Sequence, residues 1–360
     1  MPSHPKKSGG DKLRLIEVGR GAAALAVAIF HANASSRHMG GPFYPGLGVF
    51  EHGVDFFFVI SGFIIYVAHA GGTRGAAATK DYLRRRALRI FPTLWLIVAG
   101  WALLRVVVGE PPDAATFTRS MLPYPSLEPT LPLVVWTLRF ELLFYAVFAI
   151  FMFQPRFGLT AFAIWSLAVI VQMALIYSGH GLTGRASFFL SAYVLDFMIG
   201  MGVAFLYRTF AFRPSLGPLF VALCLLALSL YLLRQSGAAR VSFADYVSAP
   251  AAFGTLALGL LFAFVVYGLL AAERAVAPPA WMVRLGGMSY ALYLIHTPVN
   301  AVVQHLLPFL PAEALRWGAG HVLLVTAGVL AAAIFHDRVE RPLARHLDRL
   351  TAPRREGGLR

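Results

Sequence analysis

Long apolar runs constrain this chain more than any other feature of its sequence. Ten such runs occur within its 360 residues, each bounded by charged residues or by Pro and Gly. About 20 apolar residues in a helix cross the hydrocarbon core of a bilayer, so each run is a candidate transmembrane helix. The sequence therefore predicts an all-α polytopic membrane helix bundle of about ten transmembrane helices. The expected spans are 14–34, 49–70, 89–109, 131–153, 157–177, 187–207, 216–234, 250–271, 284–307 and 319–337.

The composition excludes several classes of protein. Hydrophobic residues make up 58% of the chain and charged residues 13%, whereas soluble domains usually hold about 45–50% apolar and about 25% charged residues. A soluble enzyme, a disordered chain and a disulfide-stapled secreted domain are therefore excluded. The lone Cys224 has no partner for an intramolecular disulfide or a cysteine-based metal site.

The distribution of basic residues predicts the orientation of the chain. With both termini placed in the cytoplasm, 22 of the 31 Lys and Arg residues fall in inside segments, six fall outside and three lie within spans. This bias favours cytoplasmic termini by the positive-inside rule. The net charge of +14 is then mainly an orientation signal, and without a binding module we expect no nucleic-acid partner. We expect one transmembrane domain over residues 1–345 and a basic cytoplasmic tail over 346–360.

The first expected span carries ionisable residues on one face. Arg20 and His31 are eleven residues apart, which is within about 20° of three full helical turns and about 16 Å along the axis. Glu17 lies on the same stripe. Charges in a bilayer are costly and often functional, but a second interpretation stays open. Arg20 could pair with Glu17 and extend to the interface, with His31 marking the opposite interface.

Other spans also contain polar groups. Asp55, in the second span, is expected at a depth comparable to that of His31, and a hydrogen bond between them is one interpretation; a structural ion pair is the other. Glu141 follows Arg139 near the middle of the fourth span. In the ninth span, Tyr290 and His296 lie on a stripe that repeats every three residues.

Four arginines follow the second span in the segment DYLRRRALRIFP. They can bind anionic lipid headgroups and so orient the chain. Alternatively, Arg86 and Arg89 project together at i, i+3 and form a phosphate site at the cytoplasmic mouth. The sequence has no His and Cys spacing typical of zinc, no EF-hand and no P-loop, so we expect no metal site.

Six motifs, in order, resemble one family. They are the Arg20 and His31 spacing, GVDFFFVISGFII, RRALRIFP, WTLRFELLFY, GMSYALYLIH and a Glu340-Arg341-Pro342 triplet. Together they resemble the integral-membrane acyltransferase 3 family over residues 13–345. The resemblance is strongest to the branch that acts on exopolysaccharide, O-antigen lipopolysaccharide and Nod-type glycans.

The resemblance implies an activity. Members transfer an acyl group, commonly acetyl, from cytoplasmic acyl-CoA to a hydroxyl of a carbohydrate or glycolipid presented beyond the membrane. It implies a multi-pass protein of the bacterial inner membrane, with acyl-CoA as donor substrate and no permanently bound cofactor. By motif match, Arg20 and His31 would be the paired functional residues, and Arg86 and Arg89 the cytoplasmic R-x-x-R pair.

The ionisable residues in the spans and the family resemblance together predict a set of site residues. His31 would act as general base on the acceptor hydroxyl, with a carboxylate setting its tautomer; an acyl-histidine intermediate is the alternative. A proton-coupled transporter or flippase of a glycan or glycolipid is the competing function. The expected catalytic residues are His31, Asp55 and Glu141, and the expected substrate-binding and donor-binding residues are Arg20, Arg86, Arg89, Tyr290 and His296.

Overall fold

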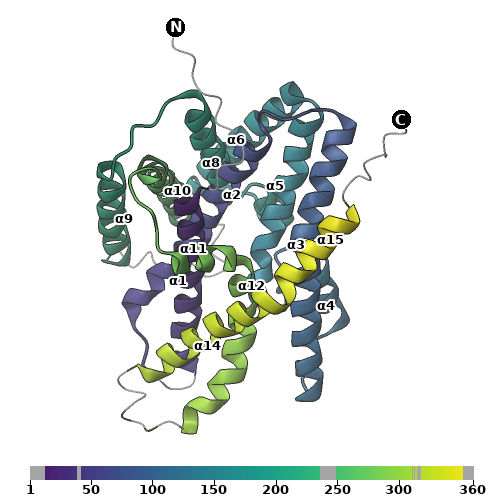
Figure 1. Cartoon of the computed structure of the whole chain (residues 1–360), viewed down its shortest axis with the longest axis vertical. Helices are drawn as coiled ribbons and strands as arrows, with labels where there is room; N and C mark the ends of the chain where they lie inside the picture. The colour runs from purple at the N-terminus through teal and green to yellow at the C-terminus, as the bar shows by residue number, and fades with distance from the viewer. Residues whose placement is uncertain are drawn as a thin grey trace, which may run out of the picture.

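The computed structural model is a bundle of helices, shown in Figure 1. It describes residues 13–38, 42–235, 249–309, 311, 313 and 318–351, and no β-strand occurs among them. The principal helices are α1 (Arg14–His38), α2 (Gly53–His69), α3 (Ala76–Val107), α4 (Ala114–Met121), α5 (Trp136–Phe153), α6 (Pro155–Tyr177), α7 (Arg185–Phe189), α8 (Tyr193–Thr209), α9 (Gly217–Gln235), α10 (Ala249–Ala272), α11 (Ala280–Gly287), α12 (Ser289–Val303), α14 (Ala319–Phe335) and α15 (Arg341–Thr351). The shorter turns are η1 (Pro45–His52), η2 (Leu133–Val135), η4 (Gln304–Phe309) and the π-helical turn η5 (His336–Glu340).

Nine stretches within the described residues are long and apolar enough to cross a membrane. The predicted fold class, an all-α polytopic bundle, is confirmed. The ninth expected span, 284–307, differs because α11 ends at Gly287 and α12 begins at Ser289, with only Met288 between them. With 15 residues, α12 is shorter than a typical span. The last span continues through η5 into α15, so the expected boundary at 345 falls inside a helix, and residues 352–360 lie outside the described residues.

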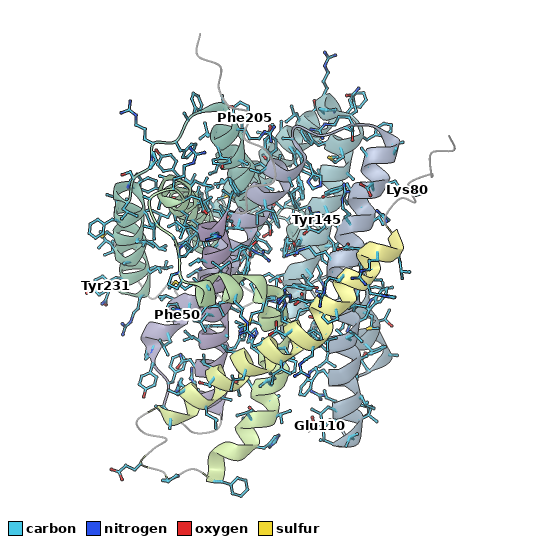
Figure 2. The ribbon with its side chains drawn as sticks, in the orientation of Figure 1. Phe50, Lys80, Glu110, Tyr145, Phe205 and Tyr231 are labelled. Carbon is cyan, nitrogen blue, oxygen red and sulfur yellow. The ribbon has the colours of Figure 1, made fainter. Side chains whose placement is uncertain are left out.

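The bundle has an interior group of helices and a peripheral group. In the apolar stretch that contains α8, 61% of the stretch is buried inside the bundle, whereas only 6% of the α9 stretch is buried. Figure 2 shows Tyr145 inside the bundle and Phe205 and Tyr231 pointing outward, where both are more than half exposed. A helix that exposes apolar residues all round is suited to lipid. Helix α9 is therefore a lipid-facing helix and α8 a core helix.

Helices α2 and α8 are in direct backbone contact at two glycines. A Cβ atom on Gly200 would overlap the carbonyl oxygen of Val59, and one on Gly62 would overlap the carbonyl oxygen of Phe197. The absence of side chains lets the two helices approach closely, as at other membrane helix interfaces. This contact places α2 in the centre of the bundle.

The start of α1 is held by two neighbouring segments. Glu273, just after α10, accepts hydrogen bonds from the backbone N–H groups of Arg14 at 2.6 Å and Leu15 at 2.9 Å. These groups have no partner within their own helix. Partial burial outweighs these bonds and raises the pKa of Glu273. On the other side, Gly286 of α11 lies against the carbonyl of Glu17 and leaves no space for a side chain.

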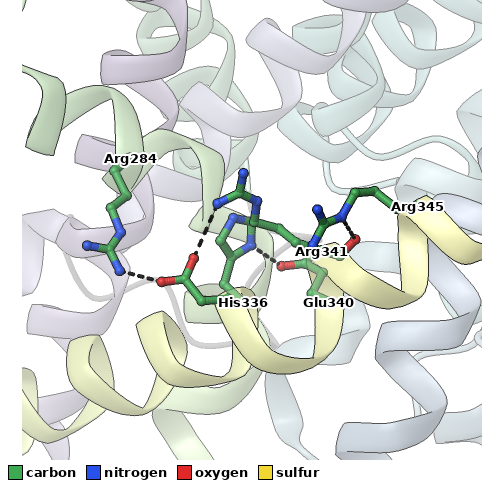
Figure 3. A network of polar contacts seen from close by, with 6 residues as sticks. Arg284, His336, Glu340, Arg341 and Arg345 are labelled. Atoms are coloured by element: carbon green, nitrogen blue, oxygen red, sulfur yellow. Dashed lines mark hydrogen bonds and ion pairs between the residues drawn. The ribbon is translucent and has the colours of Figure 1, made fainter.

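A polar network joins α11 to the π-helical turn η5 (Figure 3). Asp337 contacts Arg284 of α11 and lies 3.6 Å from Arg341, while His336 is 2.6 Å from Glu340. The Glu340-Arg341 pair of the sequence triplet thus belongs to this network. The chain passes from α14, which contacts α12, through η5 to α15, which contacts α3. These three elements run obliquely across the bundle in Figure 1.

The glycine contact makes a prediction about stability. Gly200→Ala should lower the thermal unfolding midpoint, because the added methyl group must separate α2 from α8, and overpacking typically costs about 1–3 kcal/mol. Tryptophan fluorescence of the detergent-solubilised protein measures the midpoint. Gly202→Ala in the same helix is the control, since its Cβ would meet nothing within 4 Å. Equal midpoints for the two variants would contradict the prediction.

Candidate functional site

A cavity of about 240 Å³ lies among five helices of the bundle. Five of the eight sequence-predicted site residues line it: Arg20, Arg86, Arg89, Glu141 and Tyr290. They come from α1, α3, α5 and α12, and α2 supplies much of the apolar wall. The cavity therefore brings together residues that are far apart in the sequence.

Arg20 keeps part of its guanidinium available to the cavity. Its Nη1 donates to both carboxylate oxygens of Glu17, at 3.0 and 3.2 Å. The ion pair suggested as the alternative interpretation is thus present. Because both bonds use Nη1, Nε and Nη2 can still contact a ligand, and a planar guanidinium suits a bidentate anion.

The arginine cluster of α3 divides into two pairs. Arg84 lies 2.8 Å from Asp81, Arg85 also contacts Asp81, and both arginine side chains are exposed. Arg86 and Arg89 instead line the cavity, as their i, i+3 spacing predicts. The Arg86 guanidinium lies over the rings of Tyr82 and Tyr145, at 5.8 and 5.6 Å. Ring contacts of this kind hold a guanidinium in place while its N–H groups stay free to bind.

Glu141 and Tyr290 are positioned by hydrogen bonds in the cavity wall. The Tyr145 hydroxyl donates to Glu141, and the Tyr290 hydroxyl donates to the carbonyl of Ile90 at 2.9 Å. With three arginines against Glu17 and Glu141, the lining carries a net positive charge. Such a lining is suited to an anionic ligand.

His31 and His296 form a pair of their own. Nε2 of His296 lies 3.1 Å from Nδ1 of His31. Nδ1 of His296 lies 2.9 Å from the carbonyl of Leu292, which can only accept, so Nδ1 carries the proton and Nε2 accepts. Nδ1 of His31, 3.0 Å from the carbonyl of Val27, is then the donor. This leaves Nε2 of His31 unprotonated and able to take a proton.

One aromatic residue connects the cavity with the histidine pair. Tyr293 and Phe57 both line the cavity, and their ring centroids are 5.7 Å apart. Tyr293 also lies 6.1 Å from the ring of His296. The Tyr293 hydroxyl accepts a hydrogen bond from Thr137 at 2.9 Å and lies 3.2 Å from the carbonyl of Val134. The cavity and the histidine pair are thus one aromatic ring apart.

The expected pairing of His31 with Asp55 is wrong. Asp55 is buried and lies 3.3 Å from Nδ1 of His52, three residues earlier. The turn η1 immediately before α2 brings His52 close to Asp55 and supplies this local partner. Glu141 contacts Tyr145 and not His31, so the group next to His31 is an imidazole and not a carboxylate.

Several residues of the site were not selected from the sequence. Tyr293 is one; it lies on the same stripe as Tyr290 and His296, and that spacing was a usable signal. Tyr145, four residues after Glu141, follows the i, i+4 rule for helical neighbours. Nothing in the sequence indicates that Ser61, Thr137 and Ser289 line the cavity. Within the described residues, no group of three or more His, Cys, Asp or Glu side chains could hold a metal ion.

The cavity makes a prediction about solvent access. On a Cys224→Ala background, Ser61→Cys should react with a membrane-impermeant anionic methanethiosulfonate reagent, because Ser61 lines a cavity with a positive lining. Gly202→Cys on the same background is the control and should stay unlabelled, since this exposed position lies on an apolar helix. Mass spectrometry of the intact protein measures both. An unreactive Ser61→Cys variant would show that water does not enter the cavity.

Comparison with known proteins shows the family of the chain. The chain is 30% identical over 315 residues to the exopolysaccharide production protein ExoZ of Rhizobium meliloti, covering 81% of this chain and 89% of that protein. It is 25% identical over 329 residues to the acyltransferase MdmB of Streptomyces mycarofaciens, covering 82% of this chain and 81% of that protein. No solved structure matches the chain. An acyltransferase-domain family model matches residues 14–336, and the chain therefore belongs to the acyltransferase 3 family of multi-pass membrane proteins.

Proposed function

We propose that this acyltransferase moves an acyl group, acetyl in the simplest case, from cytoplasmic acyl-CoA to a hydroxyl group of a surface glycan or glycolipid. One observation carries the proposal: Tyr293 lines a positively charged cavity and also lies against the imidazole pair. The similarity to a protein named for exopolysaccharide production supports a carbohydrate acceptor. The bias of 22 inside to six outside basic residues, counted over the ten expected spans, supports cytoplasmic termini.

The donor would bind at the arginine end of the cavity. Arg20, Arg86 and Arg89 offer several N–H groups to the phosphates or the pantetheine carbonyl of acyl-CoA, and charge-assisted hydrogen bonds are among the strongest in proteins. The apolar wall from α2 would accept the acyl group, whose thioester then lies near Tyr293. Movement of this ring would bring the thioester to the histidine pair.

The transfer itself would use His31 as general base. Nε2 of His31 takes the proton of the acceptor hydroxyl while its oxygen attacks the thioester carbonyl carbon. A C–O bond forms, the C–S bond breaks, and the imidazolium returns the proton to the leaving thiolate. His296 accepts a hydrogen bond from Nδ1 of His31, which holds the ring in the required tautomer and stabilises its protonated form.

His31→Ala should strongly reduce transfer while donor binding persists, because the base is removed and the arginine cavity is left intact. General base catalysis contributes about 10²–10⁴-fold, and the rate should fall by that amount. Radiolabelled acetyl-CoA and extracted surface glycan measure transfer by the protein in nanodiscs, and calorimetry measures CoA binding. His305→Ala, at an exposed histidine of η4, is the control. A fully active His31→Ala protein would rule out the general-base role; a wild type that moves glycan without acylating it would indicate a transporter.

Arg20→Lys should raise the KM for acetyl-CoA about tenfold or more, since hydrogen bonds to charged groups contribute about 1.5–3 kcal/mol. The single ammonium group of lysine would be occupied by Glu17 and could not also reach the donor. Initial rates at varied acetyl-CoA concentration measure the effect. Arg85→Lys, at the exposed arginine paired with Asp81, should leave KM unchanged. Equal KM values for the two variants would contradict a donor role for Arg20.

A further inference from the structure

Helices α1, α12 and α14 meet beyond the histidine pair, on the side away from the cavity. Polar side chains from all three helices occur there: Asn33, Thr297, Asn300 and His321, which we call the polar seam. We propose that the polar seam binds neutral hydroxyl groups of the acceptor glycan next to His31. This inference rests on the proposed function and assigns it an acceptor subsite.

Helix register and one hydrogen bond place Asn300, His321 and Asn33 in one row. A Cβ atom on Gly328 of α14 would lie 3.4 Å from the Cβ of His296, so these two positions face each other. Asn300 lies one turn after His296 on the same face of α12, and His321 lies two turns before Gly328 on the same face of α14. His321 in turn contacts Asn33 of α1 at 3.1 Å. The row therefore runs from His296, past Asn300, to the contact between His321 and Asn33.

Several polar atoms of the polar seam have no hydrogen-bond partner among the described residues. Asn300 is only 2% exposed, yet neither its Oδ1 nor its Nδ2 has a partner there. The same holds for Oγ1 of Thr297 and Nδ1 of His321. Buried polar groups in proteins are nearly always hydrogen-bonded, and each exception calls for an explanation. A bound ligand that supplies these partners is such an explanation.

Asn33, in contrast, has a partner for each polar atom of its amide. Nδ2 donates to the carbonyl of Tyr44 at 3.0 Å, and Oδ1 accepts from the N–H of Tyr44 at 2.9 Å. Oδ1 also accepts from Nε2 of His321, so Nε2 carries the proton and Nδ1 of His321 is a free acceptor. Asn33 thus holds His321 in one tautomer and presents its lone pair to the row.

The chemistry of the row identifies the ligand class. Asn300 offers two donors and an acceptor, Thr297 a hydroxyl and His321 an acceptor, and none of them carries a fixed charge. Neutral donors and acceptors are suited to the hydroxyl groups of a sugar, whereas the three arginines that line the cavity are suited to an anion. The acceptor would reach His31 from the end opposite to the donor.

Asn300→Leu tests the polar seam. We expect it to raise the KM for glycan at least about fivefold, because the hydrogen bonds of a buried amide are lost, while the KM for acetyl-CoA stays unchanged. The thermal midpoint should hold or rise, since leucine removes buried polar atoms without partners. The acceptor is the surface glycan fraction of a strain that lacks this gene, with radiolabelled acetyl-CoA and full-length protein in nanodiscs. Gln154→Leu, at an exposed amide between α5 and α6, is the matched control.

Each other outcome overturns a stated claim. An unchanged glycan KM in Asn300→Leu overturns only the claim that the polar seam binds the acceptor. A lowered midpoint with both KM values raised shows a structural role for Asn300 and overturns the polar seam as well. A wild type that binds CoA but acylates none of the glycan fraction overturns the proposed function itself, which separates the two failures.

Discussion

The cost of placing charge in a bilayer governs this structure, because every ionisable group in a span must face protein or water. Arg139, only 1% exposed, donates from Nη1 to the carbonyls of Ser126 and Glu128. Asp55 is within hydrogen-bond distance of His52, and Arg20 donates to Glu17. Arg86 and Arg89 instead face the cavity. These two arginines, together with the part of Arg20 that Glu17 does not engage, are the cationic groups assigned to the donor in the proposed function.

Tyr293 lies between two kinds of residue in the proposed function. The arginines of the cavity suit an anion, whereas the imidazoles and amides near His31 carry no fixed charge. Under that proposal, the donor and the acceptor would be recognised by different forces within one bundle. The two close backbone contacts, α2 against α8 and α1 against α11, keep the walls of both regions in register.

Much of the fold could be predicted from the sequence because the apolar runs are long and each span is independent of its neighbours. The division of the arginine cluster could also be predicted, since i, i+3 spacing is local to one helix. The partner of His31 could not. Which helix lies against α1 depends on tertiary packing, and two polar helices, α2 and α12, were equally compatible with the sequence. The break at Gly287 was missed because apolar residues continue on both sides of it.

The π-helical turn η5 has a consequence for the register of everything after it. A π turn holds one more residue than an α turn, and one residue of α-helix corresponds to about 100° of rotation. Deletion of a single residue within 336–340 would rotate α15 by roughly that angle relative to α14. The face of α15 that contacts α3 would then turn away from α3 without any change in its own residues. Chain length in this segment, and not only its composition, is therefore part of what keeps α15 packed against α3.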